Sequence, residues 1–374
     1  MRPRDSVLVY QETQSSDKST KTIDLDLVDP VSALGFEFEV TNGPSYNKQN
    51  PFPFVVTKIE VVDGSDVLAS LTFPQMQALH FYKTGKQPEL REDEVGGSGQ
   101  VMGTQLLFGR HLYDSEFALD LTKFKNPQLK ISWDLTNIRA VSATTAFATG
   151  TFKLSAWAKI MENIGAMPSK FLMAKELESW TGATSGDHRT DLPVDYPYKM
   201  LMLRGYSRAT NVVYDTDELI TKVKLTADSD KYIALERYTK QLRAEMAQLF
   251  GSVEVWKRFS AKHTDNLWFE VNQEPQLSLI GTVVNRALGY GWCWSGAAYL
   301  LFGDTAAGTV STEERVDGKI NGHGLHHTIP VPFGKMDDPG SWFDPTPYKK
   351  LELVCTQGGA AGALAVVAEQ VRPQ

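Results

Sequence analysis

Two stretches share one pattern and decide the fold: Lys58-Ile59-Glu60-Val61-Val62-Asp63-Gly64-Ser65-Asp66 and Lys222-Val223-Lys224-Leu225-Thr226-Ala227-Asp228-Ser229-Asp230. They are 164 residues apart (222 − 58 = 164), and Leu71 and Leu235 keep this spacing without a gap. In each stretch apolar and polar residues alternate, a Ser-Asp pair marks a turn, and a second strand and an amphipathic helix are predicted to follow. The sequence therefore contains an internal repeat of one supersecondary arrangement.

The same period of two recurs from one end of the chain to the other. The clearest further runs are residues 22–27, 36–40, 129–133, 152–157, 267–271 and 351–354. Alternation with one polar face is typical of antiparallel sheets that pack on one side and face water on the other. The ends of the two halves also match, since residues 126–157 resemble residues 345–368 in the order of strand, loop and strand. We therefore predict an all-β protein built from two tandem β-sandwiches of the same topology, with short helices.

Three helices are predicted. The first begins at Thr72-Phe73-Pro74-Gln75, which has the form of a capping box, and ends at Gly85. The second runs from Arg237 to Phe250, and Gly251 ends it. A third candidate spans Pro168 to Trp180, and the polar loop after it, residues 181–187, is the best candidate for a domain boundary.

Composition excludes several classes of protein. The 374 residues include 42% hydrophobic and 22% charged residues, which are globular values, and the net charge of −7 argues against a general nucleic-acid binder. Cys293 and Cys355 lie in apolar stretches, so we expect buried free thiols. Because no signal peptide and no apolar run long enough to span a bilayer is found, we expect a soluble protein made in a cytoplasm.

Two polar clusters could bind a cation. His323, His326 and His327 form the densest group of possible metal ligands, but they follow an Asn-Gly turn without a cysteine, so a solvated hairpin loop is the better interpretation. Asp215 and Asp217 have the first spacing of a calcium loop, yet the glycine and distant glutamate that should follow are missing. A solvated turn before a strand is the better interpretation there.

Catalytic and nucleotide-binding motifs are incomplete. Ser207 lies in Gly205-Tyr206-Ser207-Arg208-Ala209, which has alanine where a hydrolase elbow needs glycine. Gly97-Ser98-Gly99 lacks the ending of a phosphate-binding loop, and Trp292 and Trp294 could stack on a sugar or base but are better explained by core packing. We therefore predict no catalytic, cofactor-binding or metal-binding residue and no cofactor.

The strand and turn patterns resemble a known family. The stretch Val56–Leu71 with its following helix, the stretch Leu119–Leu129 and the crossing segment Asp191–Arg204 are similar to double jelly-roll major capsid proteins of tailless icosahedral viruses and phages. The likeness extends from about Lys21 to the C-terminus. It implies two eight-stranded jelly rolls, a homotrimer with pseudo-sixfold outline, and an icosahedral shell, usually around an internal membrane.

The expected domains are an N-terminal arm (1–20), a first jelly roll (21–165), a linker with a short helix (166–196) and a second jelly roll (197–374). The arm is polar from Gln11 onward and carries Arg2 and Arg4, so we expect it to be poorly ordered and to face the particle interior. The long loops 44–54, 87–102 and 306–319 are candidates for outer towers or clamps between subunits.

The implied function is that of a non-enzymatic major capsid protein of the virion, made in the host cytoplasm. Its implied partners are other copies of itself, neighbouring capsomers, penton and minor capsid proteins and an internal viral membrane, with no specific nucleic acid. The alternative is a tandem β-sandwich that binds or cleaves carbohydrate, which should place paired carboxylates beside exposed aromatic residues. The strand acids Asp24, Asp26, Glu37, Glu39 and Glu60 instead occupy the alternating positions of a wet face.

Overall fold

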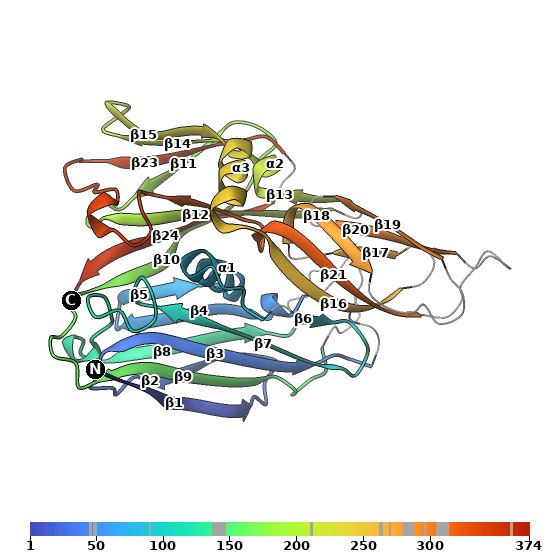
Figure 1. Cartoon of the computed structure of the whole chain (residues 1–374), viewed down its shortest axis with the longest axis horizontal. Coiled ribbons are helices and arrows are strands. Elements are labelled where there is room, and N and C mark those ends of the chain that lie inside the picture. Colours follow the sequence, from blue (N-terminus) through green and yellow to red (C-terminus); the bar gives the residue numbers. More distant parts are fainter. Residues whose placement is uncertain are drawn as a thin grey trace.

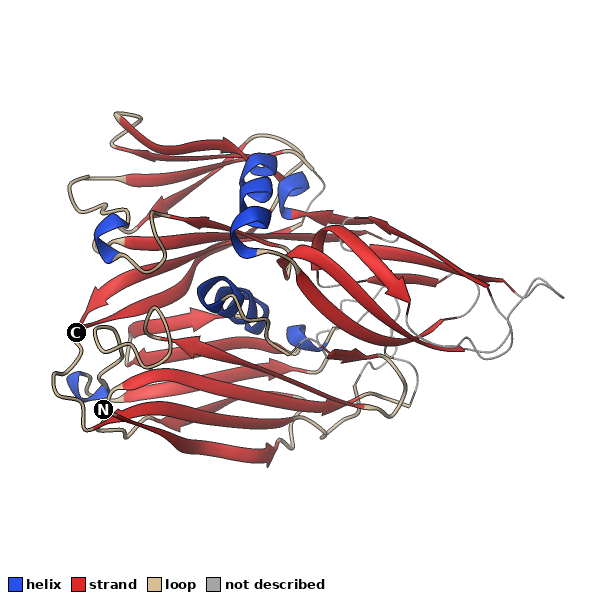
Figure 2. Cartoon of the chain, in the orientation of Figure 1, coloured by secondary structure: helices blue, strands red, loops and turns tan. Residues whose placement is uncertain are grey.

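The first half of the chain forms two antiparallel four-stranded sheets (Figures 1 and 2). The computed structural model describes residues 1–44, 47, 51–89, 91–136, 147–209, 212–261, 265–268, 271–279, 288–294, 297–303, 314–359 and 362–374. One sheet has the order β1 (Arg2–Thr13), β9 (Lys153–Glu162), β3 (Val31–Thr41) and β7 (Gly99–Leu107). The other has the order β5 (Asp66–Leu71), β4 (Val56–Asp63), β8 (Pro127–Asp134) and β2 (Lys18–Asp24). Alternate residues of both sheets, such as Phe36, Phe38, Ile59 and Ile131, share one buried core.

The second half repeats this arrangement. Its first sheet has the order β10 (Lys170–Thr181), β24 (Ala363–Pro373), β12 (Tyr198–Ala209) and β22 (Thr328–Pro332), and β13 (Val212–Asp215) also pairs with β12. Its second sheet has the order β15 (Tyr232–Tyr238), β14 (Ile220–Ala227), β23 (Leu351–Gln357) and β11 (Asp187–Leu192). Apart from β13, each roll thus has eight described strands in the same order, and the prediction of two tandem eight-stranded jelly rolls is confirmed.

Irregularities in strand pairing recur at the same places in both rolls. The β1–β9 pairing shifts between Val7 and Val9, and the β10–β24 pairing shifts between Glu176 and Glu178. Position 176 therefore corresponds to position 7, an offset of 169 (176 − 7 = 169). Three further shifts coincide in the same way, in β3–β9 and β12–β24, in β4–β8 and β14–β23, and in β4–β5 and β14–β15. Bulges of this kind set register, so the two rolls correspond residue by residue.

This correspondence corrects the gap-free repeat expected from the sequence. Strands β4 and β14 keep the offset of 164, but Ala69 rather than Leu71 corresponds to Leu235, an offset of 166 (235 − 69 = 166). The reason is the turn between the strands, which has the two residues Gly64 and Ser65 in the first roll and residues 228–231 in the second. The offset of 166 then continues through the following helix to its glycine stop.

Two helices confirm their predicted ends. Helix α1 (Phe73–Thr84) has the capping box of Thr72 and Gln75, and Gly85 ends it in the left-handed conformation with φ 64°. Helix α3 (Thr239–Phe250) ends at Gly251 as predicted, but it begins two residues after the predicted start at Arg237, because residues 237 and 238 belong to β15. The remaining helical segments are short: α2 (Thr216–Leu219), η1 (Phe52–Phe54), η2 (Leu121–Lys123) and η3 (Pro339–Ser341). Within the described residues, no helix is long and apolar enough to cross a membrane.

The helix predicted over residues 168–180 is wrong, because this segment is strand β10. Phe171, Leu172, Met173 and Ala174 are all buried. A strand that is covered on both faces has a continuous apolar run, which cannot be distinguished from a buried helix by periodicity. Strand β10 also pairs in parallel with β5 of the first roll, through Ala174–Ala69 and Lys175–Ser70, and so joins the two rolls in one extended sheet.

The poorly ordered arm expected at the N-terminus is also wrong. Residues 2–13 form strand β1, which pairs with β9 and places Leu8 and Val9 against the core. Among the described strands, β9 alone pairs with β1. The outward residues of β1 are polar or exposed, so the segment has the composition of a tail although it is an edge strand.

The second roll carries a lobe that was not predicted, which projects to the right in Figure 1. It contains two sheets: β18 (Val271–Leu279), β21 (Glu314–Leu325), β16 (Val253–Ala261) and β6 (Arg91–Asp93) in one, and β17 (Asp265–Trp268), β20 (Ala297–Gly303) and β19 (Leu288–Trp294) in the other. Of the three predicted outer loops, residues 87–102 contain β6 and the start of β7. Of residues 44–54 the structure describes 44, 47 and 51–54, which include η1, and of residues 306–319 it describes 314–319, the start of β21.

Candidate functional site: the junction between the two rolls

Helix α1 of the first roll is packed against the second roll, and its side chains form the centre of the junction. The Nε2 of His326 lies 2.7 Å from the Oε1 of Gln77, and the hydroxyl oxygens of Tyr82 and Thr328 are 2.9 Å apart. All four residues are buried. Burial raises the pKa of Tyr82 and outweighs its hydrogen bond to Thr328, so the phenol stays protonated as a donor.

One buried carboxylate forms ion pairs with two lysines whose side chains are buried at this junction. Glu369 of β24 lies 2.5 Å from the Nζ of Lys83 on α1 and 3.2 Å from the Nζ of Lys199 on β12. Lys83 also donates a hydrogen bond to the Leu107 carbonyl at 2.8 Å. All three charged side chains are 1% exposed, so the Coulomb attraction is little screened and each group depends on the others.

The protonation of this triad follows from burial and from its unequal charge. Burial lowers the pKa of Lys83 to about 8, because the attraction of Glu369 is offset in part by the second lysine, Lys199. Burial acts to raise the pKa of Glu369, but the charges of Lys199 and Lys83 outweigh it and leave that pKa lowered. Glu369 is therefore ionised at neutral pH and holds the two rolls together.

A second buried ion cluster joins the rolls through the lobe. Lys257 on β16 lies 2.9 Å from Glu92 and 2.8 Å from Glu94, in the segment where β6 runs parallel to β16. Burial would lower the pKa of Lys257, but the two glutamates outweigh it and raise the pKa. The lysine is therefore charged, and the lobe is attached to both rolls.

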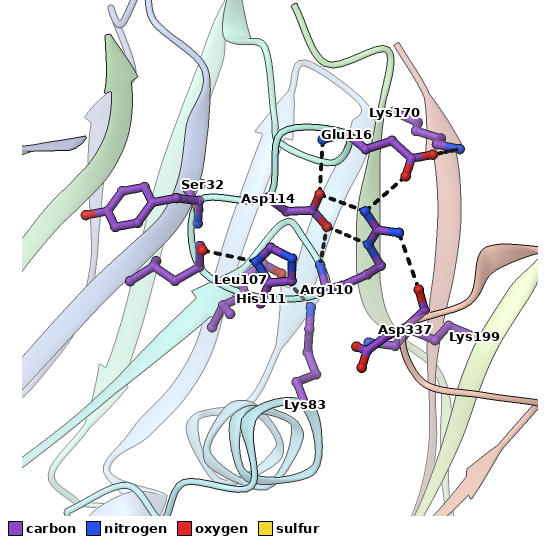
Figure 3. Close-up of polar contacts among 12 residues, drawn as sticks. Ser32, Lys83, Leu107, Arg110, His111, Asp114, Glu116, Lys170, Lys199 and Asp337 are labelled. Atoms are coloured by element: carbon purple, nitrogen blue, oxygen red, sulfur yellow. Dashed lines mark hydrogen bonds and ion pairs between the residues drawn. The ribbon is translucent and has the colours of Figure 1, made fainter. Parts of the chain in front are cut away.

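A third polar contact lies at the end of the junction shown in Figure 3. Arg110 of the first roll donates two hydrogen bonds to the carboxylate of Asp114, at 2.7 and 2.9 Å, and one to the carbonyl of Asp337 in the second roll at 3.3 Å. Glu116 bridges Arg110 to Lys170 on β10. Burial acts to raise the pKa of Asp114, but the guanidinium of Arg110 leaves it lowered, so this bridge is ionic at neutral pH.

The predicted hairpin loop of histidines is wrong. Asn321 and Gly322 lie inside β21, and the turn is at residues 324–327, where His326 and His327 have positive φ. Both side chains are fully buried: His327 lies 2.7 Å from Asp215, while His326 contacts Gln77. His323 instead lies 2.9 Å from the carbonyl oxygen of Gly251. The three imidazoles thus have three different partners.

The predicted solvated turn at Asp215 and Asp217 is also wrong, since both residues are buried. The backbone N–H of Asp215 donates to Glu218 at 2.9 Å and begins α2, and Asp217 pairs with Arg243 at 3.0 Å. Burial raises the pKa of Asp217. These carboxylates position α2 and the histidine turn. Among the described residues, no group of three histidine, cysteine, aspartate or glutamate side chains is placed to hold a metal ion.

Ser207 is not brought to the Asp215–His327 pair. In the β12–β13 register Asp215 is opposite Tyr206, whose ring centroid lies 4.5 Å from that of His327. Successive side chains of a strand point to opposite faces, so Ser207 points away from this pair. Gly97 lies in a turn before β7, which begins at Gly99.

The two cysteines and the tryptophans are placed as follows. Cys355 is a buried free thiol, as predicted, and burial raises its pKa to about 12. Cys293, Trp292 and Trp294 lie in β19, and the predictions for their side chains fall outside the described residues.

The junction residues were missed at the sequence level, although a signal for them exists. Lys199 and Glu369 each interrupt or end an otherwise apolar strand, and Lys83 lies on the helix whose apolar face was recognised. A lone charge in a strand that is apolar on both faces must find a partner, because an unpaired buried charge is strongly unfavourable. Glu369 has one partner in its own roll, Lys199, and one in the first roll, Lys83, and neither pairing could be named from sequence spacing.

Known structures share this arrangement, although no protein-family model and no curated protein matches the sequence. The crystal structure of the STIV MCP has a TM-score of 0.61 at 10% identity, covering 99% of this chain and 97% of that one. The major capsid protein P2 from bacteriophage PM2 has a TM-score of 0.52 at 10% identity, with 100% and 98% covered. The PBCV-1 virus capsid gives 0.56 at 8% identity, with 99% and 93% covered. The chain therefore has the double jelly-roll fold of these capsid proteins over its whole length.

Proposed function

We propose that this chain is a major capsid protein that forms trimers of pseudo-sixfold outline, and that these trimers tile an icosahedral shell. The observation that carries the proposal is the double jelly roll itself, in which two rolls correspond strand by strand and bulge by bulge. Two similar rolls in each of three chains give six similar wedges. Such a ring can make near-equivalent contacts with its neighbours on every side.

The junction supports this role. A capsomer that bears load needs its two rolls in one fixed orientation, and here the described contacts include shared sheet pairing, a buried triad and a buried lysine cluster. The hydrophobic core is also continuous across the junction, since Met200, Met202 and Met246 of the second roll belong to the core of the first. Interdomain interfaces within one chain are usually more polar and allow movement, so this one is suited to a rigid unit.

The remaining assignments are part of the same proposal. The role is structural rather than enzymatic, the location is the virion, and synthesis takes place in the host cytoplasm. Its partners are other copies of the chain, neighbouring capsomers, penton and minor capsid proteins and an internal viral membrane. We place the first roll before the connection at residues 163–169 and the second after it, with β1 assigned to the first roll and β10 to the second.

The test is the oligomeric state and shape of the purified protein. Light scattering coupled to gel filtration should give a mass of about 125 kDa at micromolar concentration, three times the 41.6 kDa of one chain. Negative-stain images should show particles of roughly hexagonal outline. A monomer at micromolar concentration, or a trimer with a round or open outline, would contradict the proposal.

A further inference from the structure

The two rolls differ in one respect that their correspondence makes visible. Edge strand β5 of the first roll is covered by β10, the first strand of the second roll. The corresponding edge strand of the second roll is β15, and among the described strands none pairs with its outer edge. Likewise β10 corresponds to β1, whose outer edge is unpaired among the described strands. Both strands of the β5–β10 contact thus have a counterpart, β15 and β1, whose outer edge is unpaired among the described strands.

We propose that the open edge of β15, together with the outer face of α3, binds strand β1 of a second copy of this chain. The arrangement is the one that β5 and α1 make with β10 inside one chain. The offsets of 166 and 169 fix the register. Ala69 pairs with Ala174 inside the chain, so Leu235 should pair with Asp5 of the second copy. Ser70 pairs with Lys175, so Glu236 should pair with Ser6 of the second copy. The inference rests on the proposed function, and it names the surface through which that trimer forms.

Exposed apolar side chains mark both halves of this surface. Leu249 on α3 is 59% exposed, whereas the corresponding Lys83 on α1 has a side chain that is 1% exposed, buried against the second roll. Val101 on β7 is 39% exposed, and β7 corresponds to β22, whose residue Thr328 contacts Tyr82 of α1 across the junction. Ile233 is exposed, and its counterpart Val67 lines a cavity that Lys175 and Glu176 of the second roll also line. Exposed apolar groups at contact positions indicate a protein–protein interface.

The exposure of the start of β1 also indicates an interface. Residues 171–174 of β10 are buried, whereas the corresponding residues 2–5 of β1 are exposed. Val7 is 66% exposed, and its counterpart Glu176 accepts a hydrogen bond from Gln75 across the junction. An uncovered edge strand exposes unpaired N–H and C=O groups and is prone to pair with another chain. Pairing β1 with β15 removes both open edges at once.

The geometry of the molecule fits a head-to-tail contact. In Figure 1, β1 lies at the bottom and β15 at the top, on opposite sides of the β5–β10 pairing. A contact between two different surfaces of one chain gives a ring if its rotation closes and a filament if it does not. Because the contact between chains repeats the contact between rolls, the ring that closes after three chains contains six similar steps.

The contact between chains should nevertheless be weaker than the junction inside one chain. The three charged residues of the internal triad, Lys83, Glu369 and Lys199, correspond to Leu249, Lys159 and Ser32. Lys159 already has a carboxylate partner in its own chain, Asp5 at 3.1 Å, and Leu249 can pack on the aliphatic part of Lys159. An interface of this kind forms after each chain has folded.

Cross-linking tests the register directly. Ser6→Cys combined with Glu236→Cys, treated with a short bismaleimide, should give covalent dimers and trimers on a denaturing gel. The matched internal pair, Ser70→Cys with Lys175→Cys, should react within one chain and leave the monomer band. Thr13→Cys with Glu236→Cys is the negative control, because position 13 lies about 23 Å further along β1. The proposal fails if the control pair reacts as well as the pair at position 6.

A substitution at the surface gives an independent readout. Leu249→Lys would bring a second cation beside Lys159 of a second copy, where Asp5 already pairs with Lys159 at 3.1 Å. This variant should weaken trimer formation at least tenfold, whereas Leu249→Met should not. Because Leu249 is exposed in the single chain, both variants should fold, which circular dichroism can verify. If the wild type is a trimer, Leu249→Lys stays a trimer and the variant with Ser6→Cys and Glu236→Cys does not cross-link, this interface is overturned but the capsid function is not. A wild-type monomer would overturn both.

Discussion

Helices α1 and α3 occupy the same place in their rolls but differ in what covers them. Both follow an edge strand, both have a glutamine at the third helical position that accepts from the backbone N–H of the N-cap residue, and both end at a glycine. Nine of the twelve residues of α1 are buried, whereas three of the twelve residues of α3 are. Local signals therefore set where each helix begins and ends, and docking of the next roll decides how much of it is buried.

The largest effect is expected from removing the buried carboxylate that binds Lys83 of α1 to the second roll. Glu369→Gln would leave Lys83 and Lys199 as two buried cations without a carboxylate, which should lower the free energy of unfolding by about 3–5 kcal/mol. Urea denaturation followed by tryptophan fluorescence measures this loss. As a control, Glu236→Gln removes the partner of Lys222 on the exposed strand β15 and should have no measurable effect.

A triple variant separates the charge from the packing. Lys83→Met, Lys199→Met and Glu369→Leu together should recover most of the stability that Glu369→Gln loses, since an apolar replacement of a buried ion cluster is often neutral or stabilising. If the triple variant is as unstable as Glu369→Gln, the junction depends on side-chain shape rather than on balanced charge.

The fold could be predicted from the sequence wherever one face of a strand is wet. Alternation identified β4, β8, β9 and β14, and the box at Thr72 with Gly85 defined α1 correctly. It failed at β10, where Phe171–Ala174 is buried because this strand lies at the junction, between β24 of the second roll and β5 of the first. At β1 it failed because most residues of this edge strand are exposed rather than buried, so the strand has the composition of a tail.

The junction could not be predicted because its contacts join residues that are far apart in the sequence. Gln77 and His326 are 249 residues apart, and Tyr82 and Thr328 are 246 apart. The histidine turn was interpreted as solvated because its residues are polar, but its positive φ angles turn both imidazoles inward, onto Gln77 and Asp215. Polar residues at a turn indicate solvent only when no other part of the chain packs over that turn.

A pH titration should sharpen the same contrast between covered and open surfaces. The pKa of Lys83 is lowered from 10.5 to about 8 in the folded protein, so between these values the unfolded chain holds more protons. The contribution of Lys83 to the free energy of unfolding therefore rises with pH across this range, by up to about 1.4 kcal/mol per pH unit. The free energy of unfolding of the wild type minus that of Lys83→Met, measured by denaturation from pH 8 to pH 10, should increase with pH. A difference that stays constant would show that Lys83 keeps its ordinary pKa.

The two glycine stops should respond unequally to alanine. Gly85 has φ 64° and ψ 7°, the left-handed helical region, and Gly251 has φ 71° and ψ −163°, a region that is almost exclusive to glycine. No atom lies within 4 Å of a Cβ added at either position, so the cost comes from the backbone alone. Gly85→Ala should cost about 1 kcal/mol and Gly251→Ala about 2–3 kcal/mol in thermal unfolding. Equal losses would show that the backbone at Gly251 adjusts when a side chain is added.

The smallest effect is expected at the helix starts, where the two rolls differ by one side-chain capping hydrogen bond. The Oγ1 of Thr72 accepts a hydrogen bond from the backbone N–H of Gln75 at 3.4 Å, whereas the corresponding Tyr238 makes no such bond to its helix. Thr72→Ala should therefore cost about 1 kcal/mol, with Thr72→Ser as the conservative control.

Tyr238→Thr gives the reciprocal change. It should stabilise α3 by about 0.5 kcal/mol, because the new hydroxyl can satisfy one of the free N–H groups of the first turn. Tyr238 is largely exposed in the single chain, so little packing is lost with its ring. Differential scanning calorimetry of single chains should show the two shifts with opposite signs. If Tyr238→Thr instead lowers the melting temperature, the tyrosine stabilises α3 through its ring, and position 238 differs from position 72 in the contacts it makes as well as in its cap.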